Sequence, residues 1–343
     1  MSLIGRLLKA NPSAQVSDML TGYFVIPSAK GVFVEAGTRG LFAGGKSPTN
    51  YQVNVQNVIQ YIDIATTGNA TDFGDLSVAS SSLAGCGSIS RAVFGGGKLS
   101  NSANQNVMDY VTTASLGNAT DFGDLLGVNA QLGASSNNTR GVFFGGYDTG
   151  DIGTIQYITI ASVGNATSFG TMIRAEFTKI GCGSSTRAIQ MGGAYNGGGN
   201  YSDTITYFAY ATLGNSTSFG TYSSGNRVTP SCASSDTRAL SMGGYTDTGG
   251  ATEVNIIDYI TIASTGNTTD FGDLTVSRYE GYGVSTNTRA VAAGGLSFGG
   301  GTTLHNVMDY VTIASTGNAT DFGDLQGNTL SMAGASNGHG GLH

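Results

Sequence analysis

The stretch GNATDFGDL, residues 117–125, decides the fold of this chain, because variants of it recur six times in 343 residues. The copies begin at Gly68, Gly117, Gly164, Gly214, Gly266 and Gly317. A second landmark, an Arg followed by a short apolar run and paired glycines, recurs in step with the first. It starts at Arg39, Arg91, Arg140, Arg187, Arg238 and Arg289. A period of about 50 residues with this self-similarity indicates a repeat protein with several strands per unit.

Each unit predicts four short antiparallel strands, called a to d here. In the second unit we expect strand a near residues 82–87, strand b at 91–94, strand c at 106–112 and strand d at 120–125. The tight turn between strands c and d contains Gly and Asn, which tolerate positive φ. Four antiparallel strands per unit, with glycines where strands crowd together, predict the blade of a β-propeller.

The two ends of the chain predict how the ring closes. The first unit begins at strand b, whereas residues 326–338 resemble the strand a region of the third unit at 126–137. We therefore expect a C-terminal strand near residues 330–336 to complete the first blade and remove a free sheet edge. The sequence thus predicts an all-β, six-bladed propeller over residues 38–343, preceded by an anchoring arm over residues 1–37.

The composition narrows the classes of function. Charged residues make up 11% of the chain, glycine supplies 55 residues, and the net charge is −7. This acidic balance offers no electrostatic footprint for nucleic acid. No stretch approaches the ~18 apolar residues of a membrane-spanning helix, and the N-terminus lacks the apolar core of a signal peptide. A surface of Ser, Thr, Asn and Gly favours a virion protein, with an extracellular or cell-surface location as the second choice.

Three cysteines, Cys86, Cys182 and Cys232, lie a few residues before the Arg of their units. Their odd count and corresponding places favour small buried residues, because equivalent positions of separate blades are expected to face the same way. The matching positions of other units are read as Ala134, Val284 and Ala335. We expect neither disulfides nor a metal or redox centre here.

Three repeated motifs are better explained by structure than by function. Asp-Phe-Gly occurs four times without the phosphate loop or catalytic loop of a kinase. Asn-x-Thr fits the glycosylation pattern in all six copies, but its place in a tight turn is explanation enough. The six arginines could form an anion-binding ring or bond to carbonyls and carboxylates between strands, and we favour the second alternative.

Catalytic and metal-binding residues are scarce in the sequence. The chain has three histidines, two of them in the last five residues, and no His/Cys cluster at metal-ligand spacing. We expect no enzyme, no cofactor and no metal, although a spatial pair of glycosidase carboxylates would not show in the sequence. A weak calcium site could use the loop carboxylates Asp148, Asp151, Asp203, Asp247 and Glu253, none of which matches an EF-hand.

The loops between strands b and c vary in length and content, unlike the nearly constant a–b and c–d turns. Because strand direction alternates, the variable loops share one face with the d–a links. A rigid scaffold with variable Tyr/Gly/Asn loops is typical of recognition surfaces, and unconstrained loop drift is the alternative. The predicted ligand-binding residues are Tyr51, Tyr147, Tyr195, Tyr201, Tyr245 and Phe298.

Two further features predict assembly contacts. The arm carries apolar residues that a closed propeller cannot accommodate, so they are expected to bury against another chain; they are Leu3, Ile4, Leu7 and Leu8. Strand d carries two Asp in the first, second, fifth and sixth units and none in the third and fourth. We expect any lateral protein contact to use this neutral arc, marked by Ser168 and Ser218, because like charges repel an acidic neighbour.

The paired glycines after strand b and the Tyr of strand c resemble the kelch-type propeller repeat. Glycine pairs start at Gly44, Gly145, Gly192, Gly243 and Gly294, and the tyrosines are Tyr61, Tyr110, Tyr157, Tyr207, Tyr259 and Tyr310. Kelch repeats also carry a late Trp; this chain has none, and a Phe of strand d takes that place.

The repeat sequence DYITIASTGNTTDFGDL, residues 258–274, with its variants over about 300 residues, also resembles repeats in structural proteins of tailed phages of aquatic bacteria. The resemblance implies a non-enzymatic capsid or tail protein of a larger oligomeric assembly. Its arm would bind other virion proteins, and its propeller would recognise a host-surface glycan or protein or stabilise the particle. The alternatives are a carbohydrate-active propeller enzyme and a bacterial surface adhesin.

Overall fold

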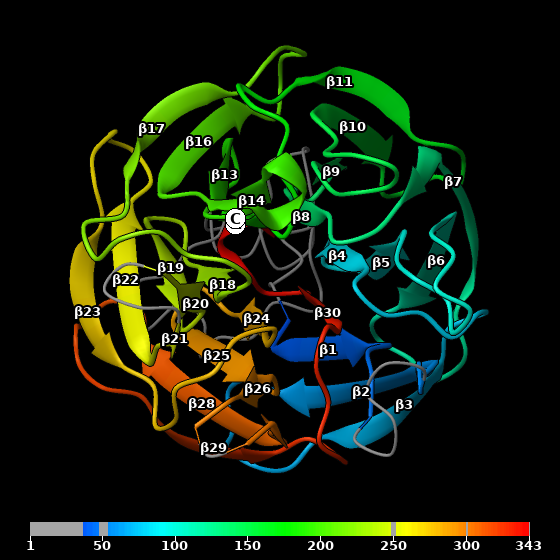
Figure 1. Cartoon of the computed structure of the whole chain (residues 1–343). Coiled ribbons are helices and arrows are strands. Elements are labelled where there is room, and N and C mark those ends of the chain that lie inside the picture. The colour runs from blue at the N-terminus through cyan, green and yellow to red at the C-terminus, as the bar shows by residue number, and fades with distance from the viewer. Residues whose placement is uncertain (1–36, 48–53, 248–251, 300, 343) are drawn as a thin grey trace, which may run out of the picture. The chain divides into compact units, whose positions relative to one another are not determined.

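The computed structural model describes residues 37–47, 54–247, 252–299 and 301–342. The chain divides into two units, Met1–Glu35 and Ala36–His343, and every described residue lies in the second. That unit consists of six four-stranded antiparallel sheets set like blades around a central axis (Figure 1). It is an all-β, six-bladed propeller, as the repeat predicts. The predicted arm residues Leu3, Ile4, Leu7 and Leu8 and the loop residue Tyr51 lie outside the described residues.

Each blade runs from an inner strand a to an outer strand d. Blade 1 comprises β30 (Ala333–Ser336), β1 (Arg39–Ala43), β2 (Val58–Asp63) and β3 (Thr71–Asp75). Blade 2 comprises β4 (Ala84–Gly87), β5 (Arg91–Gly95), β6 (Gln105–Thr112) and β7 (Thr120–Asn129). Blade 3 comprises β8 (Gly133–Ser136), β9 (Arg140–Phe144), β10 (Thr154–Thr159) and β11 (Thr167–Thr171).

The other three blades add small hairpins in their b–c loops. Blade 4 comprises β12 (Ile180–Gly183), β13 (Arg187–Met191), β16 (Thr204–Ala209) and β17 (Thr217–Thr221). Blade 5 comprises β18 (Ser231–Ser234), β19 (Arg238–Met242), β22 (Ile256–Thr261) and β23 (Thr269–Asp273). Blade 6 comprises β24 (Tyr282–Ser285), β25 (Arg289–Ala293), β28 (Val307–Thr312) and β29 (Thr320–Asp324). The hairpins are β14 (Ala194–Tyr195) with β15 (Asn200–Tyr201), β20 (Tyr245–Thr246) with β21 (Thr252–Glu253), and β26 (Leu296–Ser297) with β27 (Thr303–Leu304).

The ring closes inside blade 1, where the last strand of the propeller pairs with its first. β30 runs antiparallel to β1, with Ala335 opposite Leu41, and the two lie side by side in Figure 1. The Arg39 N–H also donates to Asn337 Oδ1 at 2.9 Å. The predicted C-terminal closure is confirmed, and it leaves blade 1 without an unpaired inner edge.

A bulge in every strand d explains the Asp-Phe-Gly motif. In blade 1 the pairing with β2 jumps from Gly74 to Asp72, so Phe73 is the extra residue of the bulge. The Phe73 ring is buried and meets Tyr61 edge-to-face at 6.0 Å. Gly74 has a φ of +149°, and a Cβ there would lie 2.4 Å from the Gly117 carbonyl oxygen of blade 2. The motif therefore sets an aromatic into the core and lets the next blade approach closely.

The hydrophobic core lies between the blades rather than within them. One cluster joins Ile189 and Phe219 of blade 4 to Ile260 of blade 5, and clusters of the same kind recur at the other junctions. Because each blade buries its apolar face only against its neighbours, the closed ring stabilises all six.

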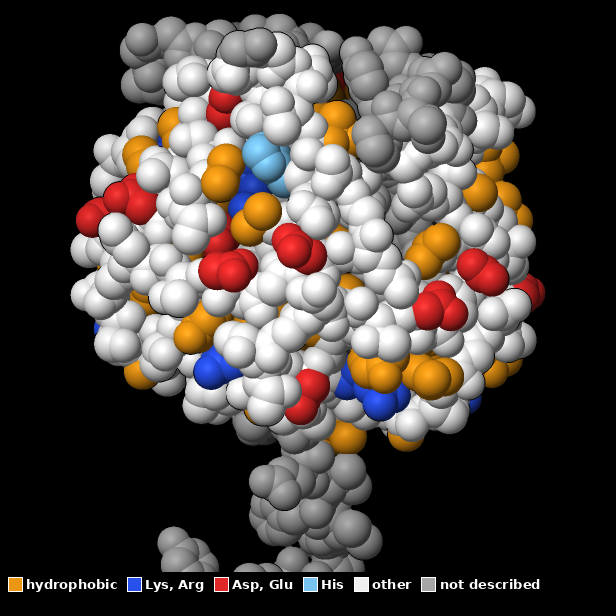
Figure 2. Space-filling view, turned by 90° about the horizontal axis from the view of Figure 1, so that it is seen from below, with side chains coloured by type: hydrophobic (Ala, Val, Ile, Leu, Met, Phe, Trp, Pro, Cys, Tyr) orange, Lys and Arg blue, Asp and Glu red, His pale blue; other side chains and the backbone are white. Residues whose placement is uncertain are grey.

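The rim beside blades 1 and 6 is mostly polar and uncharged (Figure 2). Figure 2 shows that acidic side chains are scattered over this rim and that basic ones gather near its lower edge. None of the described helices is long and apolar enough to cross a membrane. The surface fits the low share of charged residues in the sequence.

Candidate functional site

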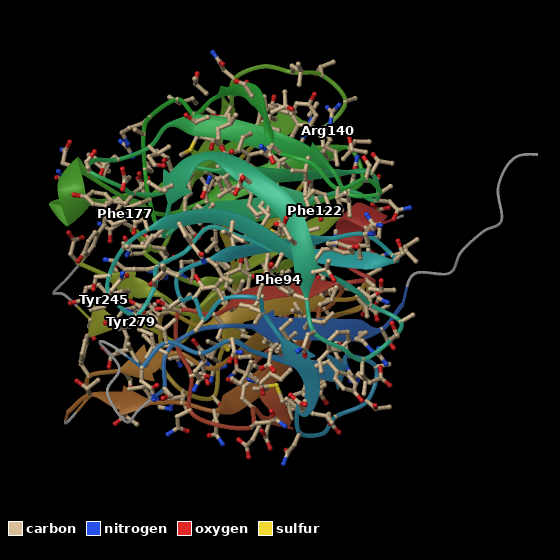
Figure 3. The ribbon with its side chains drawn as sticks, turned by 90° about the vertical axis from the view of Figure 1, so that its right-hand side faces the viewer. Phe94, Phe122, Arg140, Phe177, Tyr245 and Tyr279 are labelled. Carbon is tan, nitrogen blue, oxygen red and sulfur yellow. The ribbon has the colours of Figure 1, made fainter. Side chains whose placement is uncertain are left out.

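The propeller has two unlike faces. The turn face carries the a–b and c–d turns, and the loop face carries the b–c loops and the d–a links. Figure 3 shows Arg140 toward the turn face, and Phe177, Tyr245 and Tyr279 at the opposite end of the molecule. The constant and the variable connections are thus segregated, as predicted.

On the turn face the six arginines join neighbouring blades. Arg187 Nη1 donates to the Ile262 carbonyl of blade 5 at 2.7 Å, and its guanidinium lies 4.6 Å from the centroid of the Tyr207 ring. The other five arginines repeat both contacts, and Arg289 of blade 6 donates to Ile64 of blade 1. The structural alternative is confirmed, because all six arginines donate hydrogen bonds to carbonyls of the neighbouring blade.

The Asn of each c–d turn also reaches across a blade junction. Asn118 Oδ1 of blade 2 accepts the backbone N–H of Asp75 of blade 1 at 3.1 Å, and the five other copies do the same at 3.0 to 3.1 Å. The sequence assigned this Asn to its own turn, and the structure assigns its side chain to the neighbouring strand. The glycosylation pattern therefore coincides with a structural bond.

On the loop face the six d–a links form a ring around the axis. Each contributes a non-glycine residue with φ between +46° and +56°, two residues before the start of strand a. At five of the six junctions the N–H of one such residue donates to the carbonyl of the preceding one at 2.7 to 3.0 Å. The members of this αL ring are Ser82, Gln131, Thr178, Thr229, Glu280 and Ser331. Left-handed backbone at non-glycine residues costs free energy and marks candidate functional sites.

The αL ring surrounds a cavity at the loop-face end of the channel. All six ring residues line it, together with Lys46, Lys179 and Tyr282. Thr229 Oγ1 is buried there without a hydrogen-bond partner within the part of the chain that the structure describes. The cavity therefore combines hydroxyl, amide and carboxylate groups on a closed wall, an arrangement suited to a small polar group of a ligand.

Four aromatic rings form a continuous arc beside this cavity. The Tyr245 ring lies 5.9 Å from Tyr201 and 5.2 Å from Tyr279, and Tyr279 lies 5.6 Å from Phe298. The three tyrosines are half-buried and Phe298 is 47% exposed. Tyr279, an inner member of the arc, immediately precedes Glu280 of the αL ring, which lines the cavity. Burial raises the pKa of Tyr279 above its ordinary value, which keeps its hydroxyl protonated as a donor.

The other predicted loop aromatics are placed apart from the arc. Tyr147 packs edge-on against Phe177 at 5.3 Å, and Tyr195 lies under the Arg174 guanidinium at 3.8 Å. Three of the six predicted residues therefore come together and two do not. The sequence analysis missed Tyr279, which lies in a d–a link. No sequence signal marks it, because the αL residue that it precedes is known only from the structure, as is the one that Phe177 precedes.

Four of the five loop carboxylates considered for calcium, all but Asp203, accept hydrogen bonds from neighbouring loops or links. Asp151 of blade 3 accepts the backbone N–H groups of Asn196 and Gly197, and Glu253 of blade 5 accepts those of Phe298 and Gly299. Asp148 and Asp247 accept the side chains of Asn104 and Asn226. Over the described ranges no three His, Cys, Asp or Glu residues are grouped as metal ligands.

Buried ion pairs support the loop face under blades 4 to 6. The pairs are Glu176–Lys179 at 2.7 Å, Arg227–Asp258 at 3.5 Å and Arg278–Asp309 at 3.0 Å. Burial alone would raise the pKa of Glu176, but the charge and hydrogen bonds of Lys179 with those of Arg174 outweigh it and lower the pKa. The d–a links that lead into blades 4 to 6 thus carry buried charges, whereas those that lead into blades 2 and 3 use neutral donors, the N–H groups of Ser77 and Leu126.

The cysteines depart from the sequence analysis. Cys86 and Cys182 precede their arginines by five residues and Cys232 by six, so they are not all equivalent. Strand register makes Ser135, and not Ala134, the counterpart of Cys86. All three are free and buried, but Cys182 Sγ and Cys232 Sγ lie only 2.6 Å apart. The assumption that equivalent positions keep these thiols apart is therefore wrong for this pair.

The rim residues lie where the repeat predicts. Ser168 and Ser218 are exposed on the outer strands of blades 3 and 4, and the first Asp of strand d is exposed in the other four blades. The c–d turns of blades 2 to 4 also expose Leu116, Val163 and Leu213, at 57 to 58%. Only Val163 and Leu213 of these belong to the neutral arc, and its lateral contact remains a prediction.

The architecture defines the chain as a six-bladed β-propeller. No protein-family model matches it, and no curated protein matches it in sequence.

Proposed function

We propose that the propeller is a non-catalytic recognition domain that binds a carbohydrate on its loop face. The observation that carries the proposal is the aromatic arc of Tyr201, Tyr245, Tyr279 and Phe298, four partly exposed rings from three consecutive blades. Sugar rings present faces of C–H groups that pack on aromatic faces, and Tyr hydroxyls add hydrogen bonds at little entropic cost.

The cavity beside the arc supports the same ligand class. Glu280, Gln131 and the Thr229 hydroxyl offer donors and acceptors to sugar hydroxyls, and Thr229 Oγ1 is buried without a hydrogen-bond partner in the described part of the chain. The neighbouring carboxylates Asp151 and Glu253 accept loop N–H groups, which favours binding over a hydrolytic carboxylate pair.

An array of neutral and acidic oligosaccharides, followed by calorimetry with the best binder, tests the proposal. We expect the double variant Tyr245→Ala/Tyr279→Ala to weaken binding at least about tenfold. Tyr147→Ala is the matched control, because Tyr147 belongs to the same loop class but packs on Phe177 outside the arc. Absence of binding to any oligosaccharide, or an equal loss in the control, would overturn the proposal.

We also propose a virion as the setting, on the resemblance of the repeat to structural proteins of tailed phages. The paired glycines after strand b, with φ of +66° and +101° at Gly44 and Gly45, support the kelch-like relationship. The arm over residues 1–37 would attach the propeller to other virion proteins. A chain lacking residues 1–30 is expected to fold but not to join the particle, and its normal incorporation would contradict the anchor role.

A further inference from the structure

Two cysteines of neighbouring blades meet at the central channel. Cys182 lies on β12 of blade 4 and Cys232 on β18 of blade 5, and both line the channel. Their side chains are 8% and 7% exposed, and their sulfur atoms are 2.6 Å apart. A disulfide bond measures about 2.05 Å, so a small movement separates this contact from a covalent bond.

The register of the inner strands explains why these two side chains meet. Cys182 pairs opposite Ile189, and its counterpart on β18 is Ala233. Cys232 is one position earlier and so points from the opposite face of its strand. Cys182 therefore faces blade 5, as Cys86 faces Gly141 of blade 3, while Cys232 faces back toward blade 4.

The position of Cys232 is otherwise occupied by the smallest residues. The counterparts in the other blades are Gly334, Gly85, Ala134, Gly181 and Gly283. Blade 5 is therefore the one blade that carries a sulfur atom at this strand position. The backbones are already held close, because Ser234 Oγ donates to the Gly183 carbonyl at 2.8 Å and accepts the Gly183 N–H at 3.1 Å.

We propose that Cys182 and Cys232 form an oxidation site at which a disulfide staples blade 4 to blade 5. Forming the bond removes two protons and two electrons from the two thiols. Because both side chains are almost fully buried, we expect the oxidant to be a small molecule that can enter the channel. A bulky disulfide reagent would reach the two thiols less easily.

A hydroperoxide balances the reaction. One thiol sulfur attacks a peroxide oxygen, breaking the O–O bond and giving a sulfenic acid with release of water or an alcohol. The second thiol sulfur then attacks the sulfenic sulfur, the S–S bond forms, and the hydroxyl leaves with the thiol proton as water. Burial, followed by the contact with Cys182, raises the pKa of the Cys232 thiol, so the first step is expected to be faster in alkaline solution.

Cys86 supplies an internal control. It lines the same channel, but its sulfur packs against Gly141 and blade 3 carries Ser135 as its counterpart. The ring places one cysteine-free blade between Cys86 and Cys182, so Cys86 has no sulfur to bond with on that side.

The test uses the full chain, oxidised with hydrogen peroxide and then denatured for thiol counting and non-reducing peptide mapping. We expect the three thiols to fall to one, a Cys182–Cys232 cross-linked peptide, and recovery of all three on reduction. The Cys86→Ala variant should fall from two thiols to none. The unfolding temperature of both oxidised chains should rise by at least about 5 °C, because the bond closes a loop of about 50 residues.

Cys232→Ala must lose both the cross-link and the rise in unfolding temperature. Three titratable thiols after peroxide treatment, a cross-link that includes Cys86, or disulfides between separate chains would overturn the proposal.

Discussion

The turn face and the loop face of the propeller join each blade to the next through different kinds of contact. The turn face repeats one arginine bond and one asparagine bond at all six junctions. The loop face repeats only the αL backbone bond, at five of six junctions, and adds side-chain contacts that differ. Asp151 bonds across the junction of blades 3 and 4, whereas the Tyr245–Tyr279 and Arg278–Asp309 pairs lie at the junction of blades 5 and 6. Because the repeated bonds already hold the ring, the loop face can vary without opening it.

The largest expected effect concerns ring closure, on which both faces depend. Deleting residues 326–343 removes β30 and its pairing with β1. We expect a loss of several kcal/mol in the free energy of unfolding, measured by urea denaturation, because a paired strand and its core contacts disappear. Deleting residues 339–343 alone keeps β30 and should cost far less. If the chain lacking residues 326–343 had the same free energy of unfolding as the full chain, the closure argument would be wrong.

The second prediction compares one residue from each face. Arg187→Met removes a charged hydrogen bond to the Ile262 carbonyl and the contact with Tyr207, and it should cost about 2 kcal/mol of stability. Phe298→Ala on the loop face should cost less than about 1 kcal/mol, because that ring is 47% exposed. Thermal and urea denaturation of both variants measure the difference. A costlier Phe298 variant would reverse the comparison.

The third prediction extends the contrast to the rim. Ser168→Asp/Ser218→Asp places acidic groups on the neutral arc of blades 3 and 4. We expect stability to change by less than about 0.5 kcal/mol, while lateral association in the native assembly weakens because the arc then repels an acidic neighbour. Normal association of the variant, or an assembled structure with the Asp-bearing rim buried, would contradict the neutral-arc hypothesis.

The smallest effect is a pH dependence confined to the loop face. Burial, then the charge of Arg278, lowers the pKa of His305 below its ordinary 6.5, although Asp309 and Glu253 oppose the shift. The unfolded chain therefore binds the proton more readily, so this contribution to stability is present above pH 6.5 and is lost as the pH falls below it. His305→Gln should show a shallower loss of stability than the original chain between pH 7.5 and 5. If stability fell equally steeply with pH in both proteins, His305 would not contribute to the pH dependence.

The architecture could be predicted because every blade repeats the same physical constraints. The bulge of Phe73 with Gly74, the Arg of strand b and the missing first strand a each appear in the sequence as a fixed spacing. Six copies let such spacings stand out from chance, and the strand order, the closure and the structural role of the arginines follow from them.

The site was harder to predict because it depends on differences between blades. The partners of Tyr245 lie in the loop of the preceding blade and in the next d–a link, and Tyr279 carries no motif. The αL ring could not be predicted either. Glycine in a sequence indicates a possible positive φ, whereas Thr229 and Glu280 do not. The one-residue shift of Cys232 is the exception, because it can be counted in the sequence: Cys232 precedes Arg238 by six residues, and the other two cysteines precede their arginines by five.

The closure of blade 1 also sets the order of events during synthesis. β1 and β30 are separated by about 290 residues, so at 5 to 20 residues per second blade 1 lacks its inner strand for about 15 to 60 s. Blades 2 to 6 can pair their strands in that interval, since each is contiguous in the sequence. During synthesis the ring of blades therefore stays open, and the inner edge of β1 stays unpaired until β30 has left the ribosome.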